Sequence, residues 1–491
     1  MNNRKNIITA LFQQAVSVVS AFILPRLIIG TFGSEVNGLV SSITQFLSFI
    51  SLLEGGLGAV ILAELYKPIE QKDDNRIIEV LSAGSRFFEK LAIIFIAYSA
   101  VVSIVFPLLN AGTFSFGYIC SMVWILSIST LIHYLFSVTN KLYLQADQKV
   151  YIVNLATAGV VAANLIATLI LIKIFPEIHA VKLISGLVYL IQPIIYNRFV
   201  DRKYHISLLG NKADISVLSN RWDGFAQNLA HFINRNTDIA VLTVCVGYAQ
   251  VSVYSVYMIV INGLMSMISL ISNSYQSAFG KYYASGDYDL LRKKFIRYSD
   301  INWCLCLVIY NICLLLINHF IRLYMGGITD ADYYQPTFAL IIILANLLYC
   351  IREPYRFLVL AAGKFKETNK GAIIEAVLNL SVSIILSRRF GLAGVAIGTL
   401  VAILYRFIYF AVFLRDNIIN LKIKTYIPNI AITLIVVAVN AAVYLLYDFR
   451  IDTVTDFILQ GMVIGIAELL ITGICFAALR YIRRPFESTT H

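Results

Sequence analysis

Charged residues are scarce in this chain of 491 residues: Asp, Glu, Lys and Arg together make up only 14% of it. An ordinary soluble domain carries about 25%. Because 59% of the residues are hydrophobic, with 30 Phe and 29 Tyr, too little polar sequence remains for a disordered protein or a nucleic-acid-binding tail. Runs of about 20 nearly uncharged residues recur instead, each long enough to cross a hydrocarbon core of about 30 Å. The sequence therefore predicts a polytopic membrane protein.

Signs of cysteine or metal chemistry are also missing. The seven cysteines all fall inside apolar runs, and Cys304 and Cys306 are two positions apart, which places them on different faces of a helix. We expect packing residues there, not disulfides or a zinc site. The sequence shows no metal-ligand spacing, phosphate loop or nucleophilic triad. It therefore predicts neither an enzyme nor a cofactor.

The apolar runs predict an all-α membrane protein with about fourteen transmembrane helices. The first is too long for a cleavable signal peptide and contains Gln13, Gln14 and Pro25. Loops between the helices are short, so no soluble catalytic domain fits on either side. The predicted helices cover residues 6–30, 35–64, 84–110, 117–145, 150–172, 178–200, 222–245, 248–279, 298–324, 333–362, 367–388, 391–414, 426–447 and 455–481.

The positive charges give this topology an orientation. The net charge of +11 would suggest nucleic acid in a soluble protein, but in a membrane protein cytoplasmic loops collect Lys and Arg. With the N-terminus inside, 28 of the 39 Lys and Arg residues fall in cytoplasmic segments, 6 fall outside and 5 lie within spans. We therefore expect both termini in the cytoplasm.

The sequence also indicates an internal repeat. Predicted helices 1–6 and 7–12 have the same order of long helices and basic loops, displaced by about 214 residues, so that Lys67 matches Lys281 and Asn164 corresponds to Asn379. Six-helix halves with a site between them are typical of transporters. The repeat predicts an N-terminal six-helix lobe, a cytoplasmic linker, a C-terminal six-helix lobe, and two additional transmembrane helices with a cytoplasmic tail. These cover residues 1–200, 201–221, 222–424 and 425–491.

Polar residues form stripes along several predicted spans. In the seventh, His231, Arg235 and Asp238 share a helical face with Asn234 beside them. A charge at the membrane centre costs about 2.5–3.5 kcal/mol even on lenient scales, which favours a functional role. The alternative is hydrogen bonding between packed helices, and Arg235 and Asp238 also have the spacing to neutralise each other in part. The first, second and eighth helices carry similar stripes, which include Gln13, Gln45 and Asn262. In the eleventh, Glu375 and Asn379 lie on one side.

Other charges within spans leave two interpretations open. Arg26 follows Pro25 near the outer end of its helix and either faces a cavity or extends to the interface. Arg352 and Arg356, near the inner end of the tenth helix, either extend to the interface or receive an incoming phosphate. Glu54, in a Glu-Gly-Gly-Leu-Gly stretch, is a candidate proton or cation site.

Glycines at the start of the twelfth helix have the spacing for close helix packing. They are Gly391, Gly394 and Gly398, and we predict a structural role for them.

Three segments of the sequence carry a family resemblance. The first is Leu-Pro-Arg-Leu-Ile-Ile-Gly-Thr-Phe-Gly-Ser-Glu-Val-Asn-Gly-Leu-Val-Ser-Ser-Ile (24–43), and the second is Phe-Leu-Ser-Phe-Ile-Ser-Leu-Leu-Glu-Gly-Gly-Leu-Gly (46–58). The third runs from residue 352 to residue 399 and contains Ala-Ala-Gly-Lys-Phe-Lys. These segments resemble bacterial polysaccharide flippases, the Wzx-type transporters of the multidrug/oligosaccharidyl-lipid/polysaccharide exporter superfamily, and the resemblance spans roughly residues 1–425.

This resemblance implies two six-helix lobes around a central cavity that opens alternately to the cytoplasm and the outside. It implies a flippase of the bacterial cell membrane, moving an oligosaccharide linked to undecaprenyl pyrophosphate to the outer leaflet for capsule or O-antigen assembly. It also implies a coupling ion, H⁺ or Na⁺, and partners among the polymerase and glycosyltransferases of the same pathway. Related flippases use cationic cavity residues on their first and seventh helices, which points to Arg26 and Arg235.

Together these observations predict a substrate-binding set. Guanidinium groups would pair with pyrophosphate oxygens, and amides would hydrogen-bond to sugar hydroxyls. The predicted residues are Arg235, Arg26, His231, Asn234, Asp238, Asn262, Gln13, Gln45, Arg352 and Arg356.

Three other functions remain open. A flippase of the lipid-linked peptidoglycan precursor would need similar cavity chemistry. A cation-coupled multidrug exporter of the same superfamily predicts an acidic cavity, whereas the stripe of the first helix lacks a carboxylate. A membrane glycosyltransferase or polymerase needs carboxylates at a membrane face, often with a large outside loop, and the outside segments here are short.

Overall fold

The computed structural model describes residues 2–54, 56–109, 113–204, 225–364, 366–421, 425–446 and 451–487. Some helical side chains lie outside this description, among them those of 225–231 and 233–235. All regular elements in the described ranges are helices. The chain divides into two compact units, residues 1–252 and 253–491, and α11 runs across the boundary.

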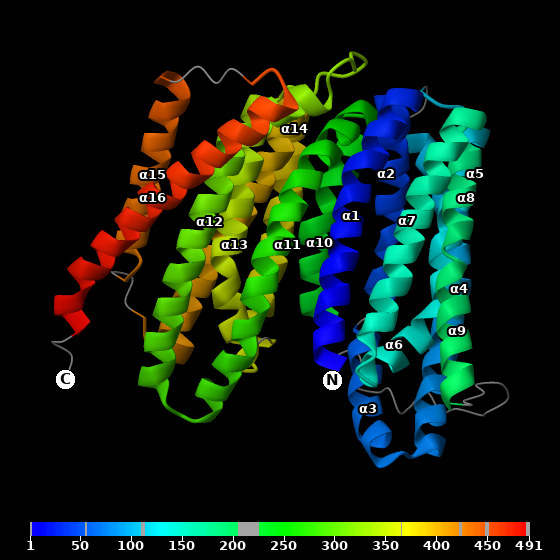
Figure 1. The fold of residues 1–491 in the computed structure, drawn as a ribbon, viewed down its shortest axis with the longest axis horizontal. Coiled ribbons are helices and arrows are strands. Elements are labelled where there is room, and N and C mark those ends of the chain that lie inside the picture. Colours follow the sequence, from blue (N-terminus) through cyan, green and yellow to red (C-terminus); the bar gives the residue numbers. More distant parts are fainter. Residues whose placement is uncertain are drawn as a thin grey trace. The chain divides into compact units, whose positions relative to one another are not determined.

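The described residues of the first unit form ten α-helices and two short irregular helices. In this unit α1 lies along α7 and α5 lies along α8 (Figure 1). In chain order the elements are α1 (Asn2–Phe32), α2 (Ser34–Ser48), the 3₁₀-helix η1 (Phe49–Glu54), α3 (Leu57–Gln71), α4 (Asp74–Leu109), α5 (Phe116–Ile132), the π-helix η2 (His133–Ser137), α6 (Val138–Ala146), α7 (Val150–Ile174), α8 (Ile178–Val188), α9 (Ile191–Tyr204) and α10 (Phe225–Cys245).

The core of this unit is apolar, and so is much of its outer surface. Phe88, Phe95 and Phe106 of α4 are buried, while Ile93 and Ile104 of the same helix are 67% and 59% exposed. A helix that is apolar all round is typical of a membrane span. This arrangement fits helices that pack against each other on one side and against lipid on the other.

The second unit is built around α12, which contacts α13, α15 and α16. Local sequence explains several helix starts: Asp287 caps α12 by accepting a hydrogen bond from the Leu290 N–H at 2.9 Å, and Pro336 takes the first position of α13. The elements are α11 (Tyr248–Ala284), α12 (Tyr288–Tyr324), α13 (Pro336–Ala361), η4 (Lys366–Thr368), α14 (Asn369–Leu414), the π-helix η5 (Arg415–Ile419), α15 (Ile427–Leu446) and α16 (Val454–Glu487).

A tight reversal divides α14 at Gly391, whose φ of 54° and ψ of −126° are not helical. The two arms then pack so closely that a Cβ at Gly394 would lie 2.3 Å from the Leu386 carbonyl oxygen. At Gly398 a Cβ would lie 2.1 Å from Ser383 Oγ. The predicted structural role of these glycines is confirmed, and the two predicted helices 367–388 and 391–414 are the arms of this hairpin.

The all-α, polytopic character predicted from the sequence is confirmed. In the described residues eleven helices are long and apolar enough to cross a membrane. One of these, Lys366–Ile419, is 54 residues long and holds both arms of the α14 hairpin, and Asn236–Cys245 and Ile427–Asn440 are shorter apolar helices. The lobe boundaries stay a prediction, and the linker 201–221 lies largely outside the described residues.

Several predicted boundaries were wrong. The segment 35–64 is not one helix, because η1 and the left-handed Gly56 (φ 82°) separate α2 from α3. Helices α4 and α12 begin at Asp74 and Tyr288, about ten residues before the predicted starts. Hydropathy detects the apolar part of a helix, and here the charged ends continue the helix beyond it.

Candidate functional site

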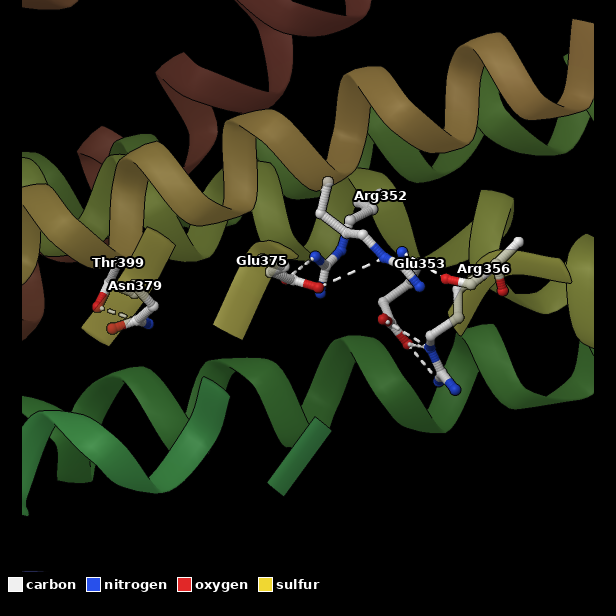
Figure 2. Close-up of polar contacts among 8 residues, drawn as sticks. Arg352, Glu353, Arg356, Glu375, Asn379 and Thr399 are labelled. Atoms are coloured by element: carbon white, nitrogen blue, oxygen red, sulfur yellow. Dashed lines mark hydrogen bonds and ion pairs between the residues drawn. The ribbon is translucent and has the colours of Figure 1, made fainter. Parts of the chain in front are cut away.

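The second unit contains a buried cluster of charges on α13 and α14. The Arg352 guanidinium donates a hydrogen bond from Nη1 to Glu375 Oε1 at 2.5 Å, and Arg352 is only 3% exposed (Figure 2). From the second arm of α14, Arg406 Nε lies 3.4 Å from Glu375 Oε2, and its Nη1 donates to the Thr368 carbonyl. One carboxylate therefore lies between two guanidinium groups and links α13 to both arms of α14.

A second ion pair lies one turn further along α13. Arg356 donates from Nε to Glu353 Oε1 at 3.0 Å and from Nη2 to Glu353 Oε2 at 2.6 Å (Figure 2). This bidentate geometry is the strongest form of an Arg–carboxylate contact. Both predicted phosphate-binding arginines of this helix are therefore held by carboxylates in this structure. The i, i+3 spacing of Glu353 and Arg356 was the available sequence signal for this pair, whereas the contact of Glu375 with Arg406 depends on the hairpin.

Polar contacts continue along α14 beyond these charges. Asn379 Nδ2 lies 3.5 Å from Thr399 Oγ1 across the hairpin (Figure 2). The Ser383 hydroxyl donates to Asn379 Oδ1 at 3.3 Å. The polar face predicted on this helix from Glu375 and Asn379 is thus buried against α13 and the second arm of the hairpin.

In the first unit, the polar stripe of α2 faces α10 and the start of α11. Gln45 Nε2 donates to Asn236 Oδ1 at 2.7 Å, and the Thr243 hydroxyl donates to Ser42 Oγ at 2.7 Å. A third contact joins Asn37 Nδ2 to Ser252 Oγ at 2.9 Å. Gln45 therefore contributes to a polar seam between helices in this conformation. Of these residues, Gln45 and Asn37 belong to the stripe predicted for this helix, whereas Ser42 and the partners on α10 and α11 were not predicted.

The structure describes the side chains of some of the remaining candidate residues but not of others. Asp238 of α10 is 4% exposed, while the side chains of His231, Asn234 and Arg235 lie outside the described residues. Gln13 donates to Ser17 Oγ on α1 at 3.0 Å, Arg26 is half-buried on the same helix, and Asn262 of α11 is exposed in the second unit. The predicted binding set stays a prediction.

A small cavity of about 160 Å³ lies between α1, α5, α7 and α8 of the first unit. Its polar lining includes Asn164, Thr168 and Lys182, and the Asn164 Oδ1 atom is buried without a hydrogen-bond partner in the described part of the chain. None of the predicted binding residues whose side chains the structure describes lines this cavity. Sequence reasoning noted Asn164 only as the repeat counterpart of Asn379.

The sequence matches no family model and no curated protein. Its fold does match solved structures. Lipid II flippase MurJ, in an inward closed conformation, aligns with a TM-score of 0.71 and 16% identity over 97% of this chain and 98% of that chain. An inward-facing MATE family multidrug resistance transporter of the MOP superfamily aligns with a TM-score of 0.69 and 14% identity over 82% of this chain and 97% of that chain. The eukaryotic MATE transporter AtDTX14 aligns with a TM-score of 0.60 and 12% identity over 85% of this chain and 96% of that chain.

These alignments show which fold the chain has. It is a multi-pass membrane protein with the fold shared by the MATE transporters and the MurJ flippase. The transporter-like fold expected from the resemblance is therefore confirmed.

Proposed function

We propose that this protein is a flippase that moves oligosaccharide repeat units linked to undecaprenyl pyrophosphate from the cytoplasmic to the outer leaflet of the bacterial cell membrane. It works by alternating access and serves surface polysaccharide assembly, such as that of a capsule or O-antigen. The observation that carries this proposal is the likeness to a lipid flippase over 97% of this chain and 98% of that chain.

The length of the chain favours a lipid-linked cargo over a drug. The alignments with the two MATE structures cover 82% and 85% of this chain, but 97% and 96% of the MATE chains themselves. This protein therefore has sequence beyond the MATE fold. We assign the surplus to α15 and α16, which follow the repeated helices, and the flippase alignment leaves little of the chain uncovered.

The predicted residues suit an anionic glycolipid. Arg235 and Arg26 would bind the pyrophosphate, because a guanidinium fork matches phosphate oxygens. His231, Asn234, Asn262, Gln13 and Gln45 would hydrogen-bond to the sugars, and Asp238 would hold Arg235 when no cargo is bound. For Gln45 this requires that its bond to Asn236 opens, and for Arg356 it requires that pyrophosphate replaces Glu353.

A second candidate is a flippase of the lipid-linked peptidoglycan precursor. It is favoured by the same alignment, because the solved structure is a lipid II flippase. A cation-coupled multidrug exporter is less consistent with the charges, since the α1 stripe of Thr9, Gln13 and Ser17 has no carboxylate. We further propose H⁺ or Na⁺ as coupling ion, and the pathway's polymerase and glycosyltransferases as partners.

Loss of the gene tests this proposal in cells. We expect surface glycan to disappear while the lipid-linked repeat unit accumulates on the cytoplasmic leaflet, as measured by extraction and chromatography of lipid-linked glycans. If the lipid-linked precursor itself fails to form, the protein acts in synthesis and the proposal is wrong. If growth stops because lipid II accumulates, the peptidoglycan alternative replaces it.

A further inference from the structure

Glu54 lies where two elements of the first unit depart from regular α-helical geometry. The α2 helix gives way to the 3₁₀-helix η1, which ends at Glu54, and Gly56 then takes a left-handed conformation with φ 82° before α3 begins. The second element is the π-helix η2, His133–Ser137, inserted between α5 and α6. Single π-turns inside helices occur frequently at functional sites.

A hydrogen bond joins these two irregular segments. The Tyr134 hydroxyl of η2 donates to Glu54 Oε1 at 2.5 Å. Tyr134 is 4% exposed, and its ring lies against Phe88 and Phe95 of α4, each with ring centroids 6.2 Å away. The carboxylate therefore contacts a phenol that is fixed by aromatic packing.

In the part of the chain that the structure describes, Glu54 takes part in no ion pair, and the charge of Lys141 on α6 acts on it only over a longer distance. The side chain of Arg235, on α10, lies outside the described residues. Glu353 and Glu375 of the second unit contrast with Glu54, because each is bound by an arginine. An ionised carboxylate removed from water costs several kcal/mol when it has no partner.

A proton is the simplest group that neutralises such a carboxylate, and this site can bind and release one without losing its hydrogen bond. A phenol hydroxyl can donate to the ionised carboxylate and can accept from the protonated one. When the proton binds, an O–H bond forms at a Glu54 carboxyl oxygen, and when it leaves, that bond breaks and the proton returns to water.

Helices α2, α4 and α10 pack against η1, and α4 and α6 also pack against η2. The titratable and charged groups on these elements and on α3 include Tyr134 and His133 of η2, Lys141 of α6, Arg86, Glu89, Lys90 and Tyr98 of α4, Glu64 of α3, Glu35 of α2, and His231, Arg235 and Asp238 of α10. Of these, the side chains of His231 and Arg235 lie outside the described residues. Arg86, Glu89 and Lys90 are exposed, and Tyr98 donates its hydroxyl to the Phe46 carbonyl. Tyr134 is therefore the described group that responds most directly to the charge of Glu54.

We propose that Glu54 and Tyr134 form a proton-binding site through which cargo movement is coupled to a proton gradient. This inference rests on the proposed flippase function and assigns the coupling ion and its residue within it.

Infrared difference spectroscopy tests proton binding without any cargo. Purified full-length protein in lipid nanodiscs is compared between alkaline and acidic buffer. We expect a carboxyl C=O band from an apolar environment that appears on acidification, is absent in Glu54→Gln and shifts in Tyr134→Phe. Glutamine keeps the hydrogen-bond acceptor, so Glu54→Gln should fold. Glu79→Gln, at a half-buried glutamate that pairs with Arg76, is the control and should keep the band. A band that persists in Glu54→Gln overturns the proposal.

Transport in proteoliposomes tests the coupling. The probe is a lipid-linked oligosaccharide, and its movement is measured with and without an imposed pH gradient. We expect the gradient to accelerate movement in the wild-type protein and in Glu79→Gln but not in Glu54→Gln. If the wild-type protein moves the lipid-linked oligosaccharide at the same rate with and without the gradient, the proton-coupling proposal is wrong while the flippase function is still supported. If no lipid-linked oligosaccharide moves under either condition, the flippase function fails, and the infrared result alone decides whether Glu54 binds a proton.

Discussion

At the scale of single residues, the most constrained charge in the described part of the chain is the Glu375 carboxylate. Its oxygens contact Arg352 and Arg406, which are both 3% exposed, so neither guanidinium has ready access to water. Burying charges is favourable only when they are paired, and removing one partner leaves the others uncompensated. The cluster therefore fixes α13 against the two arms of α14.

Glu375→Gln should destabilise the protein by about 3–5 kcal/mol, because it leaves two buried guanidinium groups without a counter-charge. Thermal unfolding in detergent measures this. Glu353→Gln is the matched control and should cost less, since the Arg356 side chain is 28% exposed and can turn toward water. Equal stability of wild type and Glu375→Gln would contradict the structural role of the cluster.

Arg235 is the residue on which we base headgroup binding. It lies about 13 residues, or roughly 20 Å, into the predicted seventh span, too deep for easy extension to the inner interface. Arg235→Ala should abolish flipping at near-normal abundance, and Arg235→Lys should restore only part, because lysine cannot form a bidentate fork. Flipping by the double variant Arg235→Ala/Asp238→Ala would show that Arg235 only neutralises Asp238.

At the scale of helices, the sequence predicted which segments span the membrane but not where the regular α-helical geometry is interrupted. Hydropathy located the spans because their apolar length is a property of consecutive residues. The 3₁₀ turn before Glu54 and the π-turn at Tyr134 depend on contacts between segments 80 positions apart. Likewise, Glu375 and Arg352 were noted separately, and only the packing of α13 on α14 pairs them. The polar stripe of α2 was predicted, but its partners on α10 were not.

The α14 hairpin predicts that Gly→Ala substitutions at two positions will differ strongly in their effect on stability. Gly398→Ala should destabilise the protein by about 1–3 kcal/mol, because its Cβ would lie 2.1 Å from Ser383 Oγ and 2.7 Å from the Ser383 backbone nitrogen. Gly263→Ala, in α11, meets nothing within 4 Å and should be neutral or slightly stabilising. Thermal unfolding of the two variants compares them directly, and equal melting temperatures would contradict the close packing of the arms.

At the scale of the whole molecule, the charge distribution predicts how the chain crosses the membrane. Thr113, in the turn between α4 and α5, should lie outside, and Ser285, in the turn between α11 and α12, should lie in the cytoplasm; both are exposed. Single cysteines at these positions, in a background without the native cysteines, are labelled with a membrane-impermeant maleimide on intact cells. Thr113→Cys should react and Ser285→Cys should react only after lysis. The reverse pattern would overturn the predicted topology.

The central claim is that this fold carries a lipid-linked oligosaccharide. The direct measurement uses purified protein in liposomes with a fluorescent oligosaccharide linked to undecaprenyl pyrophosphate, whose transfer between leaflets is followed with a membrane-impermeant glycan-modifying enzyme. Lipid II and a cationic drug serve as competing cargoes in matched liposomes. We predict protein-dependent transfer of the lipid-linked oligosaccharide that Arg235→Ala abolishes, with little transfer of the other two. Transfer of lipid II or of the drug, with none of the oligosaccharide, would contradict it.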